Sequence, residues 1–200
     1  MSILDLGKQS LIYGVGHVLA RLITFLLLPL YTHTFTQGEY GALSLAYAFM
    51  GFALILYRYG MDTALMKYSV QKEGLERKKY ITLIIVTQFI TSFLFTSIIY
   101  FTRLSTAEYV LGTYQPDWIS YLAVILFFDT LWNLPLLILR SEEKAYPYIF
   151  LSLLNVILTM VLNVMFVVYW EQGIVGVFKA NIIASAFIFL VSLPIIIKRM

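Results

Sequence analysis

Six long apolar stretches constrain this chain more than any other feature of its sequence. They span roughly 11–31, 41–59, 81–101, 118–139, 148–169 and 176–197. A helix needs about 20 mainly apolar residues to cross a bilayer. Lipid offers no partner for free backbone groups, so helices are expected, and the alternation typical of a barrel strand is absent. The sequence therefore predicts an all-α integral membrane protein, a six-helix transmembrane bundle in a single unit over residues 1–200.

Composition supports the membrane class and excludes several others. The chain is 60% hydrophobic and 12% charged, whereas soluble domains carry about 25% charged residues. Cysteine is absent, which excludes disulfides and thiolate metal sites. The net charge of +3 is modest and the basic residues flank apolar runs, so no nucleic-acid partner is expected. The first apolar stretch is longer than a signal-peptide core and is interpreted as a permanent span.

The distribution of lysine and arginine predicts the orientation. With the N-terminus inside, the inner segments hold ten basic residues and the outer loops hold only Arg103. By the positive-inside rule both ends are expected in the cytoplasm, and the bilayer partner is the cell (cytoplasmic, or inner) membrane. The ten inner residues are Lys8, Lys67, Lys72, Arg77, Lys78, Lys79, Arg140, Lys144, Lys198 and Arg199.

Ionisable residues inside spans are costly and are functional candidates by default. Arg21 lies near the middle of the first span, and His17 is one turn earlier on the same face. A guanidinium binds phosphate through its fork and stays charged. Arg21 is thus a candidate for lining a cavity; the alternative is a buried ion pair with Asp129 on another helix.

Two further pairs share helix faces. Arg58 and Asp62 are four residues apart, which fits either a local salt bridge or a cytoplasmic gate. Asp129 and Asn133 lie one turn apart in the fourth span; Asp129 either carries a proton or cation or only neutralises Arg21. Enzyme signals such as a nucleophile motif, a metal-ligand cluster or a phosphate-cradling glycine loop are missing, so neither catalysis nor a cofactor is expected.

Two stretches carry a family resemblance. The first is Ser10-Leu-Ile-Tyr-Gly-Val-Gly-His-Val-Leu-Ala-Arg21-Leu-Ile-Thr-Phe-Leu-Leu-Leu-Pro29-Leu-Tyr-Thr with Gly38-Glu-Tyr-Gly41, and the second is Tyr59-Gly-Met-Asp62-Thr-Ala-Leu-Met-Lys67-Tyr. Together they resemble the N-terminal signature of polysaccharide-biosynthesis flippases, in the multidrug/oligosaccharidyl-lipid/polysaccharide exporter superfamily to which O-antigen transporters belong. The match covers about the first 70 residues and is looser afterwards.

The resemblance implies flipping of undecaprenyl-diphosphate-linked oligosaccharide by alternating access for surface polysaccharide biosynthesis. It also implies that basic residues in the first two spans line the cavity. Arg21 matches such a position, and Arg58 is a second candidate. Family members usually have 12 to 14 spans, so the chain looks like the N-terminal lobe, which needs a C-terminal lobe or a second copy. The alternatives are a multidrug or cation antiporter lobe, an enzyme acting on polyprenyl lipids, and an assembly subunit.

Overall fold

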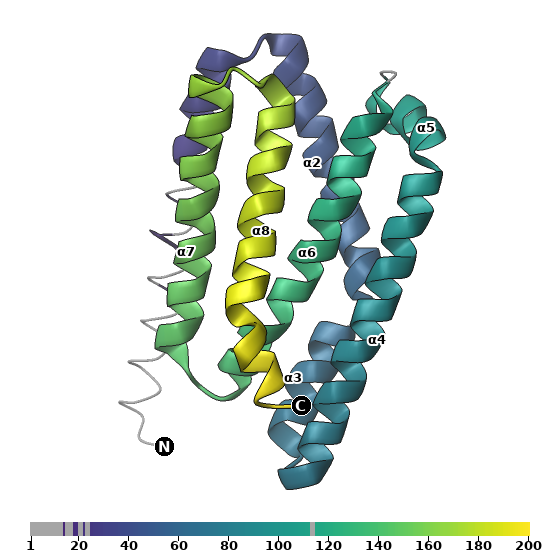
Figure 1. The fold of residues 1–200 in the computed structure, drawn as a ribbon, viewed down its shortest axis with the longest axis vertical. Coiled ribbons are helices and arrows are strands. Elements are labelled where there is room, and N and C mark those ends of the chain that lie inside the picture. Colours follow the sequence, from purple (N-terminus) through teal and green to yellow (C-terminus); the bar gives the residue numbers. More distant parts are fainter. Residues whose placement is uncertain (1–13, 15–17, 20–21, 23–24, 113–114) are drawn as a thin grey trace.

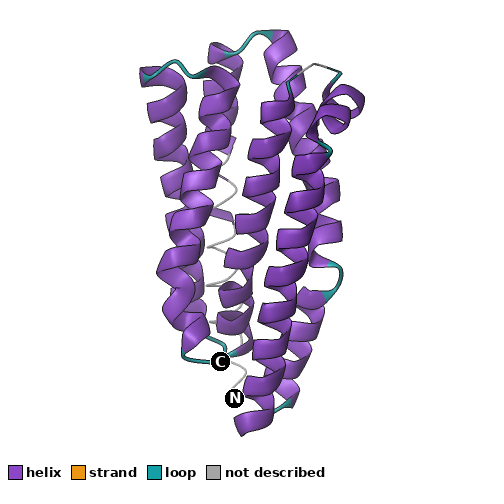
Figure 2. Ribbon diagram, turned by 45° about the vertical axis from the view of Figure 1, so that its right-hand side comes forward, coloured by secondary structure: helices purple, strands orange, loops and turns teal. Residues whose placement is uncertain are grey.

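The computed structural model describes residues 14, 18–19, 22, 25–112 and 115–200. Within them the chain is a bundle of long helices that run roughly alongside one another, and no strand occurs (Figure 2). Residues 25–34 are helical and belong to the end of the first predicted span. The rest of that span, including His17 and Arg21, lies mostly outside the described residues, so the first span, and with it the total of six, remains a prediction.

Five helical segments of the described chain are long and apolar enough to cross a membrane. They are α2 (Gln37–Arg58), α4 (Gly74–Phe101), α6 (Pro116–Ser141), α7 (Ala145–Asn163) with its continuation η2 (Val164–Tyr169), and α8 (Gly173–Ile197). Shorter elements are α3 (Met61–Gln71), α5 (Arg103–Thr106) and the π-helix η1 (Ala107–Leu111). This makes the protein a multi-pass helical membrane protein.

Local chemistry explains where these helices begin. Thr36 caps α2 in a capping box: its hydroxyl accepts from the Glu39 amide at 3.3 Å, and the Glu39 carboxylate accepts from the Thr36 amide at 2.9 Å. Pro116 stands in the first turn of α6, where its missing N–H costs nothing. The segment around 69–80, expected as an inner loop, is mostly helical, and only Lys72 and Glu73 separate α3 from α4.

Helix α6 lies at the centre of the bundle, between α8 and α4 (Figure 1). In its most apolar window 61% of the residues are buried, against 22–33% in the other four candidate spans. The outer helices expose large apolar side chains, such as Phe52 on α2 and Phe101 on α4. An apolar exterior suits contact with lipid. The buried helix α6, packed against α8 on one side and α4 on the other, forms the core of the bundle.

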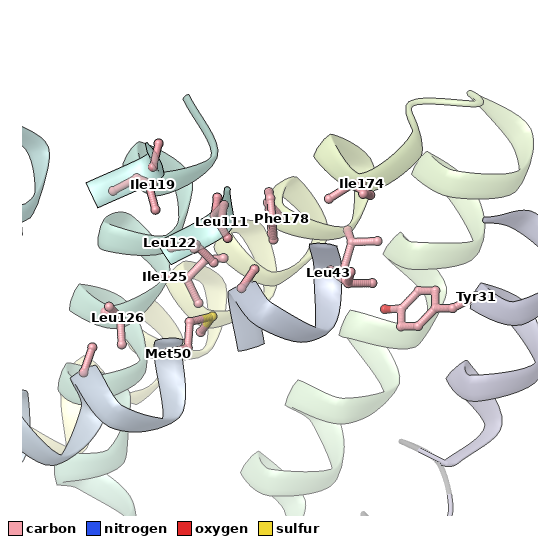
Figure 3. Packing of buried hydrophobic residues seen from close by; sticks show 14 of the residues in the cluster. Tyr31, Leu43, Met50, Leu111, Ile119, Leu122, Ile125, Leu126, Ile174 and Phe178 are labelled. Atoms are coloured by element: carbon pink, nitrogen blue, oxygen red, sulfur yellow. The ribbon is translucent and has the colours of Figure 1, made fainter. Parts of the chain in front are cut away.

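The bundle has two ends, which are named here by their short helices. The α3 end holds α3, the start of α4, the turn between α6 and α7, and the C-terminal residues (Figure 1). The α5 end holds α5, the start of α6 and the turn between α7 and α8. A large apolar cluster toward the α5 end includes Leu43, Leu122 and Phe178, with Tyr31 at its edge (Figure 3). A second cluster around Leu65, Ile81 and Leu134 packs α3 against α4 and α6.

Candidate functional site: a polar track inside the bundle

A break between α2 and α3 places the first charged pair. Tyr59 and Gly60 have φ of 28° and 89°, and Gly60 accepts this left-handed conformation without a side-chain clash. The fully buried Gln88 of α4 donates from Nε2 to the Tyr57 carbonyl at 2.6 Å, in the last turn of α2. The last carbonyls of a helix have no intrahelical donor, and this bond supplies one to the Tyr57 carbonyl. The Tyr59–Tyr68 motif found in the sequence therefore contains a structural break, and Asp62 just after the break contacts Asn133 on α6.

Arg58 is only weakly engaged by the described part of the chain. Its Nη1 lies 3.6 Å from Asp62 Oδ2, too long for a hydrogen bond, and its buried Nε has no partner there. Asp62 Oδ2 also accepts from Asn133 Nδ2 on α6 at 3.1 Å. Burial raises the pKa of the Asp62 carboxyl, while the Arg58 charge and the Asn133 hydrogen bond lower it by less. The Arg58 guanidinium thus keeps donors available for an anion.

Asp129 lies at the meeting of α6 and α8. Its Oδ1 accepts from Trp132 Nε1 at 3.1 Å and from Ser185 Oγ at 2.5 Å. Asp129 is one turn before Asn133, the residue that donates to Asp62, so the Asp62 and Asp129 carboxylates lie in the same region of the bundle. Because Arg21 is outside the described residues, the predicted Asp129–Arg21 pair remains a prediction.

A cavity of about 370 Å³ lies further along the bundle, toward the α5 end. Its walls come from the first helix, α2, α7 and α8. Two hydrogen bonds join these helices: Tyr31 Oη donates to Asn163 Oδ1 at 2.8 Å, and Asn181 Nδ2 donates to Tyr47 Oη at 3.3 Å. Asn181, which lines the cavity, is one turn before Ser185 on α8, and Ser185 donates to Asp129. The cavity therefore adjoins Asp129 and forms one polar track with it and the Asp62–Asn133 contact.

A separate ion cluster ties the α3 end together. The Glu142 carboxylate, between α6 and α7, accepts from Arg199 Nε at 2.6 Å, Arg77 Nη2 at 2.9 Å and Lys144 Nζ at 2.9 Å. These hydrogen bonds, led by that of Arg199, hold the pKa of Glu142 at about 2. The cluster links α4, the α6–α7 turn and the end of α8, and it is a structural clamp.

The sequence-predicted residues fall into two groups. The structure brings together Arg58, Asp62, Asn133 and Asp129, while His17 and Arg21 lie outside the residues it describes. Sequence reasoning missed Trp132, Gln88, Tyr47 and the Glu142 clamp. A glutamine in the middle of an apolar run was a usable signal for Gln88, but no spacing in the sequence pairs Glu142 with Arg77 or Arg199. Among the described residues no group of three or more metal-binding side chains occurs.

Comparison with known proteins defines the class. The family model described as polysaccharide biosynthesis protein matches residues 6–200. The chain belongs to this family of polysaccharide biosynthesis proteins.

Relatives and solved structures show how much of a family member the chain covers. It is 25% identical over 170 residues to Lsg locus putative protein 1 of Haemophilus influenzae, covering 84% of this chain and 39% of that protein. A solved structure named protein A superposes on this chain with a TM-score of 0.76 at 16% identity. The match covers 96% of this chain and 45% of protein A. A crystal structure of a MATE mutant has a TM-score of 0.69 at 20% identity, with coverage of 95% and 44%. The chain spans less than half the length of each of these proteins.

Proposed function

We propose that the chain is a lobe of a flippase that moves undecaprenyl-diphosphate-linked oligosaccharide across the cell (inner) membrane by alternating access. The observation that carries the proposal is Arg58. Among the described residues its buried Nε has no partner, and its one ion pair is 3.6 Å long. A planar guanidinium with spare donors suits a diphosphate. Family membership and the transporter fold support the same class.

The remaining predicted residues take roles around this cation. Arg21 and His17 extend the diphosphate site, as the family resemblance implies. Asp62 holds the position of Arg58, Asn133 and Asp129 hold the position of Asp62 in turn, and a change in these contacts accompanies opening and closing. A second lobe, from another chain or another copy, covers the face that carries these charges, because exposing a central charge to lipid costs about 2.5–3.5 kcal/mol.

A multidrug or cation antiporter lobe is the alternative, and Asp129 is the observation that favours it. A carboxylate inside the bundle attracts a proton or a cation. The weakly paired Arg58 and the predicted mid-span Arg21 argue for an anionic substrate and against a cationic one. We therefore favour the anionic lipid-linked oligosaccharide over a cation as the substrate.

Transport by Arg58 variants tests the proposal. In vesicles loaded with lipid-linked oligosaccharide, Arg58→Ala should reduce flipping about 10- to 100-fold, since a hydrogen bond to a charged group is worth about 1.5–3 kcal/mol. Arg58→Lys should recover only part of the rate, because the fork is lost. The matched control is Arg140→Ala, an exposed arginine for which the described residues provide no ion pair. Full flipping by Arg58→Ala would exclude a diphosphate role for this residue.

Orientation is tested separately. We propose that the α3 end and both termini face the cytoplasm. Single cysteines placed at Lys78 and Lys144 should resist an impermeant maleimide applied to intact cells, while cysteines at Gln37 and Gln172 should react. Labelling at position 78 from outside would reverse the orientation.

A further inference from the structure

The cavity toward the α5 end has an unusual lining for a site next to charged groups. The described residues that line it are all uncharged, and they combine aromatic rings with small polar groups. Three tyrosines contribute, Tyr31, Tyr40 and Tyr47, and its volume of about 370 Å³ is within the range of about 300–1,000 Å³ for small-molecule sites. Among the described residues the lining offers no charge to offset the desolvation of an ion, so this part of the cavity suits a neutral, hydroxyl-bearing ligand.

One polar group in this lining is unused by the part of the protein that the structure describes. Asn155 Nδ2 on α7 is buried and has no hydrogen-bond partner among those residues. An unsatisfied buried donor costs about 1–3 kcal/mol, so it calls for an acceptor that arrives with a ligand. By contrast the Asn163 amide, two turns further along α7, is satisfied on both sides by Tyr31 and the Thr159 carbonyl. The two asparagines thus differ: Asn163 holds helices together, and Asn155 is left free in the cavity wall.

The rest of the lining adds complementary groups. Ser44 Oγ donates to the Tyr40 carbonyl and keeps its lone pairs for a donor from a ligand. Tyrosine rings offer apolar faces with a polar edge. Sugar rings have the matching features, because their hydroxyl groups both donate and accept while their C–H faces are apolar.

Position along the bundle links this cavity to the proposed diphosphate site. Tyr47 precedes Arg58 by eleven residues on α2, a rise of about 16 Å. Asp129 connects the two regions: it accepts from Ser185, one turn from the cavity residue Asn181, and it is one turn before Asn133, which donates to Asp62 beside Arg58. We propose that the cavity binds an uncharged sugar unit of the lipid-linked oligosaccharide while Arg58 binds the diphosphate. This inference rests on the proposed function and adds a recognition site for the carbohydrate.

Binding of two matched lipids tests the inference. The probes are undecaprenyl diphosphate alone and the same lipid carrying neutral oligosaccharides, each titrated against the protein in nanodiscs. Asn155→Leu should weaken binding of the glycosylated lipids about 10-fold, the equivalent of one hydrogen bond, and leave the bare lipid unchanged. The control is Ile157→Leu, at an exposed apolar position two residues away. Since Asn155 Nδ2 bonds nothing in the described part of the protein, the variant should keep the native Tm.

A second measurement uses the absence of cysteine. Ser44→Cys places a thiol in the cavity wall, and glycosylated lipid should slow its reaction with a maleimide at least about 5-fold while bare lipid does not, as expected for a lining group that the ligand covers. Equal effects of Asn155→Leu on both lipids, or no protection of the thiol, would overturn the sugar site. The proposed function would still stand if binding of the bare lipid depended on Arg58. Binding of neither lipid by the native protein would overturn both.

Discussion

Glu142 at the α3 end and Arg58 in the last turn of α2 are two charged groups with opposite degrees of pairing. Glu142 accepts hydrogen bonds from three basic side chains that come from different parts of the chain. Within the described residues Arg58 has one acidic neighbour at 3.6 Å and a buried donor without a partner. A fully paired charge fixes helices relative to one another, whereas an underused one is available for a ligand. The comparison separates a charge that holds the fold from one that is available to a ligand.

The largest expected effect on stability comes from Glu142. Glu142→Gln should lower the free energy of unfolding by about 1–3 kcal/mol, because Arg77 and Arg199 lose an ionised acceptor. Thermal unfolding in detergent should show a lower Tm, with the flipping rate per folded molecule unchanged. Glu143→Gln is the matched control, since this exposed neighbour has no ion pair among the described residues. An unchanged Tm in Glu142→Gln would show that the clamp is not structural.

The same clamp predicts a pH dependence. The pKa of Glu142 is lowered from 4.5 to about 2, so its contribution to stability is fully present above pH 4.5 and is lost as the pH falls toward 2. The difference in unfolding free energy between the native protein and Glu142→Gln should therefore be constant at neutral pH and shrink over that acidic window. A difference that disappears near neutral pH instead would contradict the assigned pairing.

Arg58 should affect stability least. Arg58→Ala removes a long, partly exposed ion pair, and such pairs are worth about 0–1 kcal/mol. We expect a Tm close to native, in contrast to the expected loss of transport. The stability of Arg58→Ala in the Asp62→Asn background should also stay near native. A Tm loss as large as that of Glu142→Gln would remove the distinction between the two regions.

Apolar length and charge placement made much of the architecture predictable. Stretches of about 20 apolar residues require helices in lipid, and five of the predicted spans coincide with helices that fit a membrane. Their ends shifted by a few residues, because caps such as Thr36 and the charged first turn of α4 extend helices beyond the apolar core. The Arg58–Asp62 pair was also predictable, since residues four apart share a helix face.

Contacts between distant segments were not predictable, because helix periodicity gives the face of a residue but not the neighbour that it meets. Asn133 reaches Asp62 across 71 residues, and Glu142 reaches Arg77 across 65. Asn155, whose Nδ2 has no partner among the described residues, and the bonded Asn163 look alike in sequence. The sequence by itself determined a helical membrane protein of the polysaccharide biosynthesis family with charges in its spans. Only helix packing decided which of those charges are satisfied and which polar groups remain for a ligand.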